Sequence, residues 1–74
     1  MSWLPIPSER MKRARELRGW SVEELAERAG IARSTASRAD NGRPVNAATK
    51  RRLANAFQRT PPDPALEALL EGRA

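Results

Sequence analysis

The sequence lacks two residue types on which much protein chemistry depends: its 74 residues include no cysteine and no histidine. Without cysteine, neither a disulfide nor a thiolate metal site can form. Without histidine, the commonest metal ligand and the commonest general base are both missing. We therefore expect no metal site, no cofactor and no catalytic residue, and we predict that the protein is not an enzyme.

Long apolar runs are missing as well. A helix that spans a membrane needs about 20 consecutive apolar residues, and no stretch of this chain comes close. The segment 1–7 contains Trp3, Leu4 and Ile6, but it has neither the basic leader nor the long apolar stretch of a secretory signal. We expect no membrane partner and a cytoplasmic location.

Aromatic residues are scarce, with one phenylalanine, two tryptophans and no tyrosine. Arginine, alanine and leucine are abundant instead, and this composition favours helices over strands. The chain has room for one compact domain, and a domain of this size buries only about 60% of its unfolded surface. Its margin of stability should therefore be narrow.

Start and stop signals divide the first half of the chain into helices. The first helix should begin at Ser8, taken as its capping residue, and end at Gly19. The second should begin at Ser21, where Glu24 three residues later completes a capping box, and it should end at Gly30. A third segment covers about 32–40 and is closed by the turn pair 41–42.

Two more helices follow. The fourth should start at the capping residue Asn46 and end at the proline-containing break 60–62. Its apolar spacing predicts one buried face, formed by Thr49, Leu53, Ala56 and Phe57. The last helix is capped by Asp63, with Pro64 at its first position. Because the gaps between these segments are short, we predict an all-α fold, a compact five-helix bundle.

The net charge of +5 is unevenly distributed. Basic residues dominate 1–20 and 45–60, the stretch 21–44 is balanced, and the tail from 61 onward is acidic. A basic small domain suggests a polyanionic partner, usually a nucleic acid. A merely solvated basic surface remains the alternative on charge alone.

The stretch 22–42 contains two of the predicted helices joined by a turn of three or four residues. Ala26 is small enough for the second helix to cross it at close range, and Gly30 can take the positive φ of a tight turn. The inward positions are expected to be Leu25, Ala29, Ile31, Ala36 and Ala39. The remaining positions from 33 to 38 are polar, and a helix placed in this way presents its N-terminal half to the major groove of DNA.

Over about residues 9–58 the sequence resembles the Cro/C1-type (XRE) helix-turn-helix family of phage repressors and bacterial regulators. The matching elements occur in the family's order and at its spacing: Arg15, Gly19-Trp20-Ser21, Glu24-Leu25-Ala26, Ala29-Gly30-Ile31, Ser34-Thr35, Arg38, Asp40-Asn41-Gly42 and Arg51-Arg52-Leu53-Ala54. The departures are Val22 where the family usually has glutamine, Ala32 where it has serine or threonine, and Ala36 and Ala39 where it has large aliphatic residues.

The resemblance implies a lambda repressor-like DNA-binding domain over 8–60, preceded by an N-terminal arm at 1–7 and followed by a short helical segment at 61–74. It implies double-stranded DNA as the partner and base-edge contacts from Arg33, Ser34, Ser37 and Arg38. It implies phosphate contacts from Ser21, Thr35, Asn41, Arg43 and Asn46. The alternative for each is an exposed polar residue on a short helix, without a role in recognition.

Two structural roles are also implied. Arg15 and Asp40 occupy positions that form an ion pair in the family, so we expect a partly buried pair here. The small Ala36 and Ala39 should leave space in the core, and we expect Trp20, or the arm containing Trp3, to pack toward it. The run 50–52 is interpreted mainly as a solvated helix face.

The last helix is the candidate for dimerisation, through Leu66, Leu69 and Leu70. Folding of these leucines back onto the core is an equal alternative. The resulting hypothesis is a bacterial or phage-encoded homodimeric repressor that binds a palindromic operator through the helix at about 32–40. The alternative is an antitoxin-type module that binds a protein partner such as a toxin and also regulates its own operon.

Overall fold

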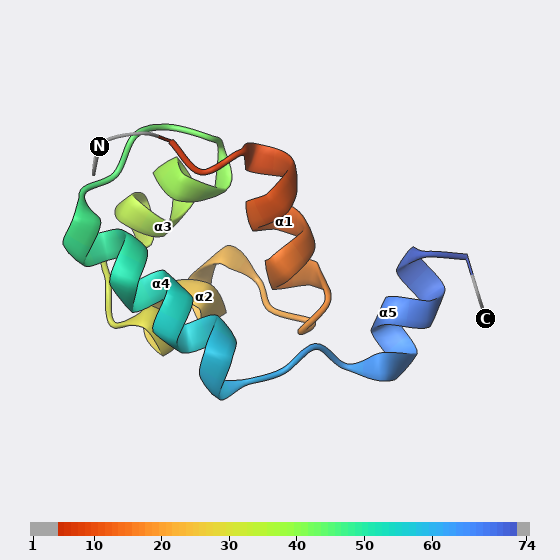
Figure 1. The fold of residues 1–74 in the computed structure, drawn as a ribbon. Helices are drawn as coiled ribbons and strands as arrows, with labels where there is room; N and C mark the ends of the chain where they lie inside the picture. Colours follow the sequence, from red (N-terminus) through yellow and green to blue (C-terminus); the bar gives the residue numbers. More distant parts are fainter. Residues whose placement is uncertain (1–4, 73–74) are drawn as a thin grey trace.

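The computed structural model describes residues 5–72, which form five α-helices and no strand. The helices are α1 (Ser8–Glu16), α2 (Val22–Ala29), α3 (Arg33–Asp40), α4 (Ala47–Arg59) and α5 (Pro64–Leu70). The prediction of an all-α, five-helix fold is confirmed. Helices α1 to α4 form the body of the molecule, in which α2 packs against α3 and α4, and α1 packs against α3 (Figure 1).

Three of the predicted N-terminal caps are present. Ser21 Oγ accepts a hydrogen bond from the Glu24 amide at 3.1 Å, and the Glu24 carboxylate accepts one from the Ser21 amide, which completes the capping box. Asn46 Oδ1 accepts from the Thr49 amide at 2.8 Å. Asp63 Oδ1 accepts from the Ala65 amide at 2.9 Å. Each cap satisfies an amide that has no partner within its helix.

The predicted cap of α1 is wrong. Pro7 holds the capping position, and Ser8 is the first helical residue. The Ser8 hydroxyl donates instead to the carbonyl oxygen of Asp40 at 2.8 Å. That carbonyl ends α3 and lacks an intrahelical partner, so the serine satisfies the end of a different helix. The contact joins the start of α1 to the end of α3.

The core is built from the inward faces of α1 to α4 and the segments between them. Its buried apolar residues are Met11, Trp20, Leu25, Ala26, Ala29, Ala36, Ala39, Val45, Leu53 and Ala56. Trp20 and the two small alanines all belong to this cluster, and whether Trp20 packs toward the alanines stays a prediction; Trp3 lies outside the described residues. Thr49 and Phe57 are only partly buried, in contrast to the prediction. The Phe57 ring stacks on Trp20 with the ring centroids 5.9 Å apart.

Arg18 joins the end of α1 to the end of α4. Its guanidinium donates to the carbonyl oxygens of Ala14, Phe57 and Thr60 at 2.6–2.9 Å. The same group lies 4.8 Å from the Phe57 ring centroid, within the range of a cation–π interaction. Burial lowers the pKa of Arg18 below its ordinary value. The guanidinium satisfies carbonyls at two helix ends that would otherwise lack partners.

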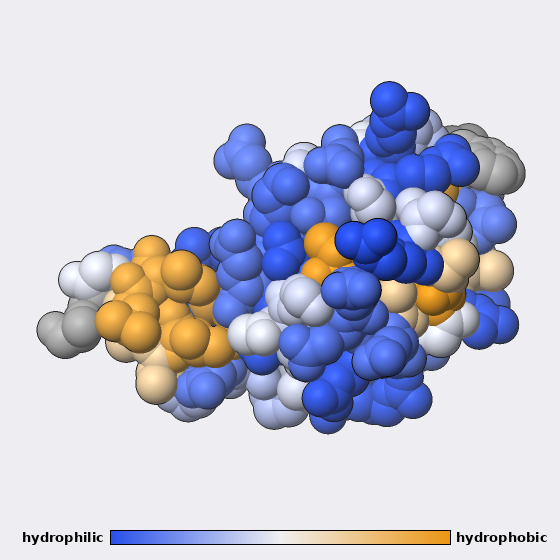
Figure 2. Space-filling model, turned by 180° about the vertical axis from the view of Figure 1, so that it is seen from behind, coloured by the Kyte–Doolittle hydropathy of each residue, from blue (hydrophilic) through white to orange (hydrophobic). Residues whose placement is uncertain are grey.

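Helix α5 stands apart from the body at one end of the molecule (Figure 1), which extends over 37 × 20 × 18 Å. The Asp63 amide donates to the Leu17 carbonyl at 2.9 Å, Arg13 pairs with Glu71, and Leu66 lies against Gly19. The other two leucines of α5 face solvent, with Leu69 64% and Leu70 46% exposed. Figure 2 shows the resulting apolar patch on α5, beside an otherwise largely hydrophilic surface.

Within residues 5–72, no helix is long and apolar enough to cross a membrane.

Candidate nucleic-acid interface

The turn between α2 and α3 fixes the angle at which the two helices meet. Gly30 ends α2 with a φ of 68°, in the left-handed region where a side chain would be strained. The Ile31 amide then donates to the carbonyl of Ala26 at 3.0 Å, which closes the helix end. Ala26 itself is buried, so its small side chain permits the close approach. The residues selected from the sequence as the scaffold of this turn therefore serve that purpose.

Helix α3 presents a polar face to solvent. Arg33, Ser34 and Arg38 are exposed, and Ser37 is partly buried on the same helix. Ala36 and Ala39 on the opposite side are completely buried. All four residues predicted to contact bases thus lie on one short helix, and three of them have accessible side chains.

Arg33 is held loosely by the start of α2. Its Nε lies 3.8 Å from a carboxylate oxygen of Glu23, and the two side chains are 73% and 72% exposed. An ion pair so open to water contributes little to stability. The guanidinium can therefore leave Glu23 at small cost. The pair also places the N-terminus of α2, where Ser21 is exposed, next to the N-terminus of α3.

The opposite end of α3 carries two further predicted phosphate-contacting residues. Asn41 and Arg43 are both exposed. The Arg43 amide donates to the Arg38 carbonyl at 2.9 Å, and Asn41 Nδ2 lies 3.5 Å from Ser37 Oγ. An eight-residue helix is about 12 Å long, so predicted phosphate contacts stand at both ends of the predicted reading surface.

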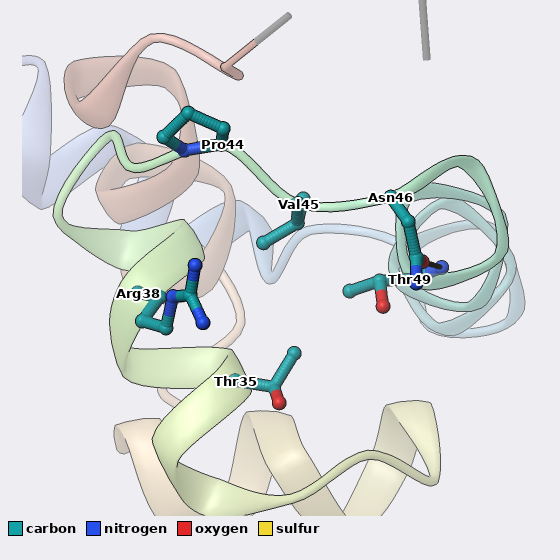
Figure 3. Close-up of a pocket in the computed structure, with 6 residues that line it drawn as sticks. All are labelled: Thr35, Arg38, Pro44, Val45, Asn46 and Thr49. Atoms are coloured by element: carbon teal, nitrogen blue, oxygen red, sulfur yellow. Dashed lines mark hydrogen bonds between the residues drawn. The ribbon is translucent and has the colours of Figure 1, made fainter. Parts of the chain in front are cut away.

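A depression of about 180 Å³ lies between α3 and the start of α4 (Figure 3). Arg38 and Thr35 project into it from α3, and Asn46 and Thr49 face them from the beginning of α4. The remaining lining comes from Pro44 and Val45. The depression thus unites one residue predicted to contact a base with two predicted to contact phosphate.

Thr49 was not among the predicted contact residues. Its apolar spacing with Leu53 suggested a core position, but it is only partly buried and lines the depression. The available signal was its place three residues after the capping residue Asn46, in the first turn of α4, beside a residue already predicted to contact phosphate.

Arg15 and Asp40, the two residues paired by resemblance, are in contact. Arg15 Nε donates to Asp40 Oδ1 at 2.9 Å and Nη1 donates to the carbonyl of Trp20 at 2.9 Å. Lys12 Nζ, which the sequence did not single out, donates to Asp40 Oδ2 at 3.1 Å. Burial alone would raise the pKa of Asp40, but hydrogen bonds from Arg15 and Lys12 outweigh burial and lower the pKa below its ordinary value. The carboxylate is only 5% exposed, so this cluster locks the end of α3 onto α1.

Two arginines beyond α3 make structural contacts. Arg52 Nη1 donates to the carbonyl of Gly30 at 3.2 Å, and Arg59 Nη2 donates to the carbonyl of Arg28 at 3.2 Å. Both carbonyls belong to the end of α2. Part of the basic charge of α4 therefore stabilises the helix-turn-helix unit.

In the part of the chain that the structure describes, no group of three or more Asp or Glu residues could hold a metal ion. A helix-turn-helix family model matches residues 11–64, which is most of the chain and includes all of α2, α3 and α4. No curated protein and no solved structure gives a significant match.

Proposed function

Because the chain belongs to the helix-turn-helix family of Cro/C1-type (XRE) DNA-binding domains, we propose that it is a homodimeric repressor that reads a palindromic operator with α3. Membership of this family assigns the chain a DNA-binding, transcription-regulating kind of function. It is not a family of enzymes. The repressor activity, the dimer and the operator symmetry are the parts that we propose.

The observation that carries the proposal is the exposed polar face of α3. Arg33 and Arg38 are five residues apart, and both guanidiniums are accessible. Arginine can donate two hydrogen bonds to O6 and N7 of guanine, the commonest specific contact in the major groove. Ser34 and Ser37 lie between the arginines and have hydroxyls small enough to accept or donate at a neighbouring base edge. We therefore expect an operator half-site that contains guanines.

The residues around α3 support contacts with DNA phosphates at both ends of the helix. The first-turn amides of α2 and α4 can each receive a phosphate, beside Ser21 and Asn46 respectively. Thr35, Asn41 and Arg43 would complete these contacts. Phosphate contacts position the protein without reading sequence, so these five residues should affect affinity on all DNA.

The apolar patch on α5 supports the dimer. Leu69 and Leu70 face solvent on a helix that stands outside the body. Pairing this patch with its counterpart on a second copy would remove both from water. A two-fold dimer would place two copies of α3 at half-sites about one DNA turn apart. Occupying such an operator is sufficient to block transcription.

The proposal is tested by selecting bound duplexes from a random-sequence pool and measuring affinity for the enriched site at several salt concentrations. We expect a palindrome. Arg33→Ala and Arg38→Ala should each weaken binding to the selected site by roughly 5- to 150-fold and relax the preference at one base position. Arg43→Ala should weaken binding to all duplexes and reduce the salt slope by about one.

Arg10→Ala supplies a matched control, because it removes the same charge from an exposed position on α1, outside α3 and the depression beside it. It should leave base preference unchanged. The proposal would be wrong if no sequence is enriched, or if Arg33→Ala and Arg38→Ala weaken binding to every duplex equally.

A further inference from the structure

A second depression lies between α1 and α4 and shares no lining residue with the one beside α3. Its volume is about 250 Å³. Its apolar lining comes from both helices and from the segment before α1: Ile6, Met11, Ala14, Leu53, Ala54 and Phe57. Its charged lining consists of Arg10 from α1 and Lys50 from α4, with no carboxylate among the lining residues. This α1–α4 groove therefore combines apolar walls with two cations.

The floor and one wall of the groove are held in place by the core. Met11 and Leu53 are 2% and 1% exposed, so close packing beneath the groove fixes them. Phe57 is partly buried, and its ring is held by the stack with Trp20 and by the Arg18 guanidinium, 4.8 Å from the ring centroid. A ligand would therefore meet a surface that is already formed, and little free energy would be lost in ordering the site.

The two cations have no anionic partner within residues 5–72. Neither Arg10 nor Lys50 forms an ion pair there, whereas the other basic residues of α1, namely Lys12, Arg13 and Arg15, each pair with a carboxylate. The groove thus has two uncompensated positive charges beside its apolar walls. A ligand with an apolar body and one negative charge would be complementary to both features, since a few charged groups fix the orientation of a ligand in an apolar pocket.

We propose that the α1–α4 groove binds a small aromatic carboxylate, with the ring in the groove and the carboxylate beside Arg10 and Lys50. A cavity of about 150 Å³ accepts a benzene ring, so a volume of 250 Å³ suits a body of one or two fused rings. Met11 and Phe57 favour a ring over an acyl chain, because a thioether sulfur and an aromatic side chain both make favourable contacts with rings. Arginine can donate two parallel hydrogen bonds to a carboxylate.

A bound ligand would contact α1 and α4 together. The extensive contacts of α1 are with α3, and those of α4 are with α2, so the ligand would add a link between two helices held mainly by others. The competing occupant is α5 of a second copy, whose Leu69 and Leu70 are exposed. In the proposed dimer those leucines cover each other and are not available to the groove. The inference concerns the free protein and does not depend on DNA binding.

The experiment is a titration of the full chain with 2-naphthoate, followed by NMR of the alanine, leucine and methionine methyl groups. We expect one ligand to bind per chain, with a Kd of about 0.1–1 mM for a ligand of this size. The shifts should be largest at the methyl groups of Ala14, Leu53 and Ala54, which line the groove. 2-Naphthylmethanol has the same rings without the charge, and it should bind at least about fivefold more weakly.

Matched variants separate the two features of the groove. Ala54→Gln places a longer side chain in the groove from an exposed position, and it should weaken binding of both probes at least about tenfold. Ala48→Gln, exposed on α4 but not part of the groove, should have no effect. Arg10→Ala and Lys50→Ala should each weaken 2-naphthoate binding about fivefold and leave the alcohol unaffected. Arg51→Ala removes an exposed charge from α4 outside the groove and should change neither.

Stability gives a second readout that does not depend on the NMR signals. At a concentration ten times its Kd, 2-naphthoate should lower the unfolding equilibrium constant about tenfold, because it binds the folded chain. The same concentration should have little effect on the Ala54→Gln variant.

The proposal would be overturned if 2-naphthoate shows no saturable binding to the natural protein. Binding that is indifferent to Ala54→Gln would also overturn it, because the ligand would then lie elsewhere. Equal affinity for the acid and the alcohol would exclude recognition of the carboxylate. Binding to a Leu69→Ser, Leu70→Ser variant but not to the natural protein would assign the groove to α5 of a second copy.

Discussion

Helices α2 and α5 are alike in length and capping but unlike in their surroundings. Each is short and begins with a side-chain cap, Ser21 in one and Asp63 in the other. Helix α2 buries Leu25, Ala26 and Ala29 between α3 and α4, whereas α5 has no buried residue. Caps and spacing therefore specify that a helix forms. Whether the helix is part of the core depends on what the rest of the chain can pack against it.

Truncating a leucine in each helix should give the largest difference. Leu25 is completely buried, so Leu25→Ala should lower the free energy of unfolding by about 3 kcal/mol, through lost burial and the cavity left behind. Leu69→Ala, the matched control, should change it by less than about 0.5 kcal/mol in the monomer, because Leu69 is mostly exposed. Urea unfolding at low protein concentration measures both. Equal effects would mean that α5 belongs to the core.

Removing the carboxylate at the end of α3 should have the next largest effect. Asp40→Asn leaves Arg15 and Lys12 without their anionic partner and should cost about 2 kcal/mol at neutral pH. This is below the usual cost for a buried pair because the Lys12 side chain is 43% exposed. Chemical denaturation of both proteins at matched ionic strength provides the comparison.

The Asp40→Asn effect should also depend on pH in a definite direction. The folded pKa of Asp40 is lowered, so its stabilisation is fully present above the unfolded pKa of about 4. It is lost as pH falls through the folded pKa. The stability difference between the two proteins should therefore be constant near neutrality and shrink below about pH 4. A difference that grows on acidification would contradict the ion pair.

The apolar patch on α5 should matter for association and not for folding. The double variant Leu69→Ser, Leu70→Ser should abolish the proposed dimer in sedimentation experiments and weaken operator binding at least about tenfold, since a monomer reads one half-site. The unfolding free energy at low concentration should be unchanged. A double variant that remains dimeric would exclude this face as the interface.

Removing the N-terminal caps of α2 and α5 should have the smallest and most local effects. Ser21→Ala and Asp63→Ala should each cost about 1 kcal/mol of helix stability. In α2 the loss should appear in global unfolding, because the helix is part of the core. In α5 it should appear as faster amide exchange within α5, about fivefold, with global unfolding unchanged. Global destabilisation by Asp63→Ala would show that α5 and the body unfold together.

Features set by neighbours in sequence were predictable. The capping box at Ser21 and the caps at Asn46 and Asp63 each involve residues no more than three positions apart. The positive φ of Gly30 was predictable for the same reason, because it depends only on the tight turn in which the glycine lies. The contact of Arg15 with Asp40 was anticipated only through resemblance, since 25 residues separate the partners.

Features set by distant partners were not predictable. Serine is a common helix-capping residue, but the Ser8 hydroxyl donates its hydrogen bond to the carbonyl oxygen of Asp40, 32 residues away. Nothing near Arg18 indicates that the Thr60 carbonyl will face it. The base- and phosphate-contacting roles remain predictions, although the structure places their residues on and around α3. The depression containing Thr49 could be recognised only once α3 and α4 were positioned in space.

The contacts of Arg18 affect how a dimer would adapt to its operator. The guanidinium holds the carbonyl of Thr60, the residue that follows α4, while Pro61 and Pro62 separate this anchor from α5. Reorientation of α5 would have to break the contacts of Asp63, Leu66 and Glu71 with α1 and the turn after it, but it need not disturb α4 or α3. Two copies joined through α5 could then vary the distance between their half-sites without altering how each copy reads its bases. Tolerance of operator spacing would then depend on how readily α5 leaves its few contacts with α1, whereas the reading of bases would depend on the body alone.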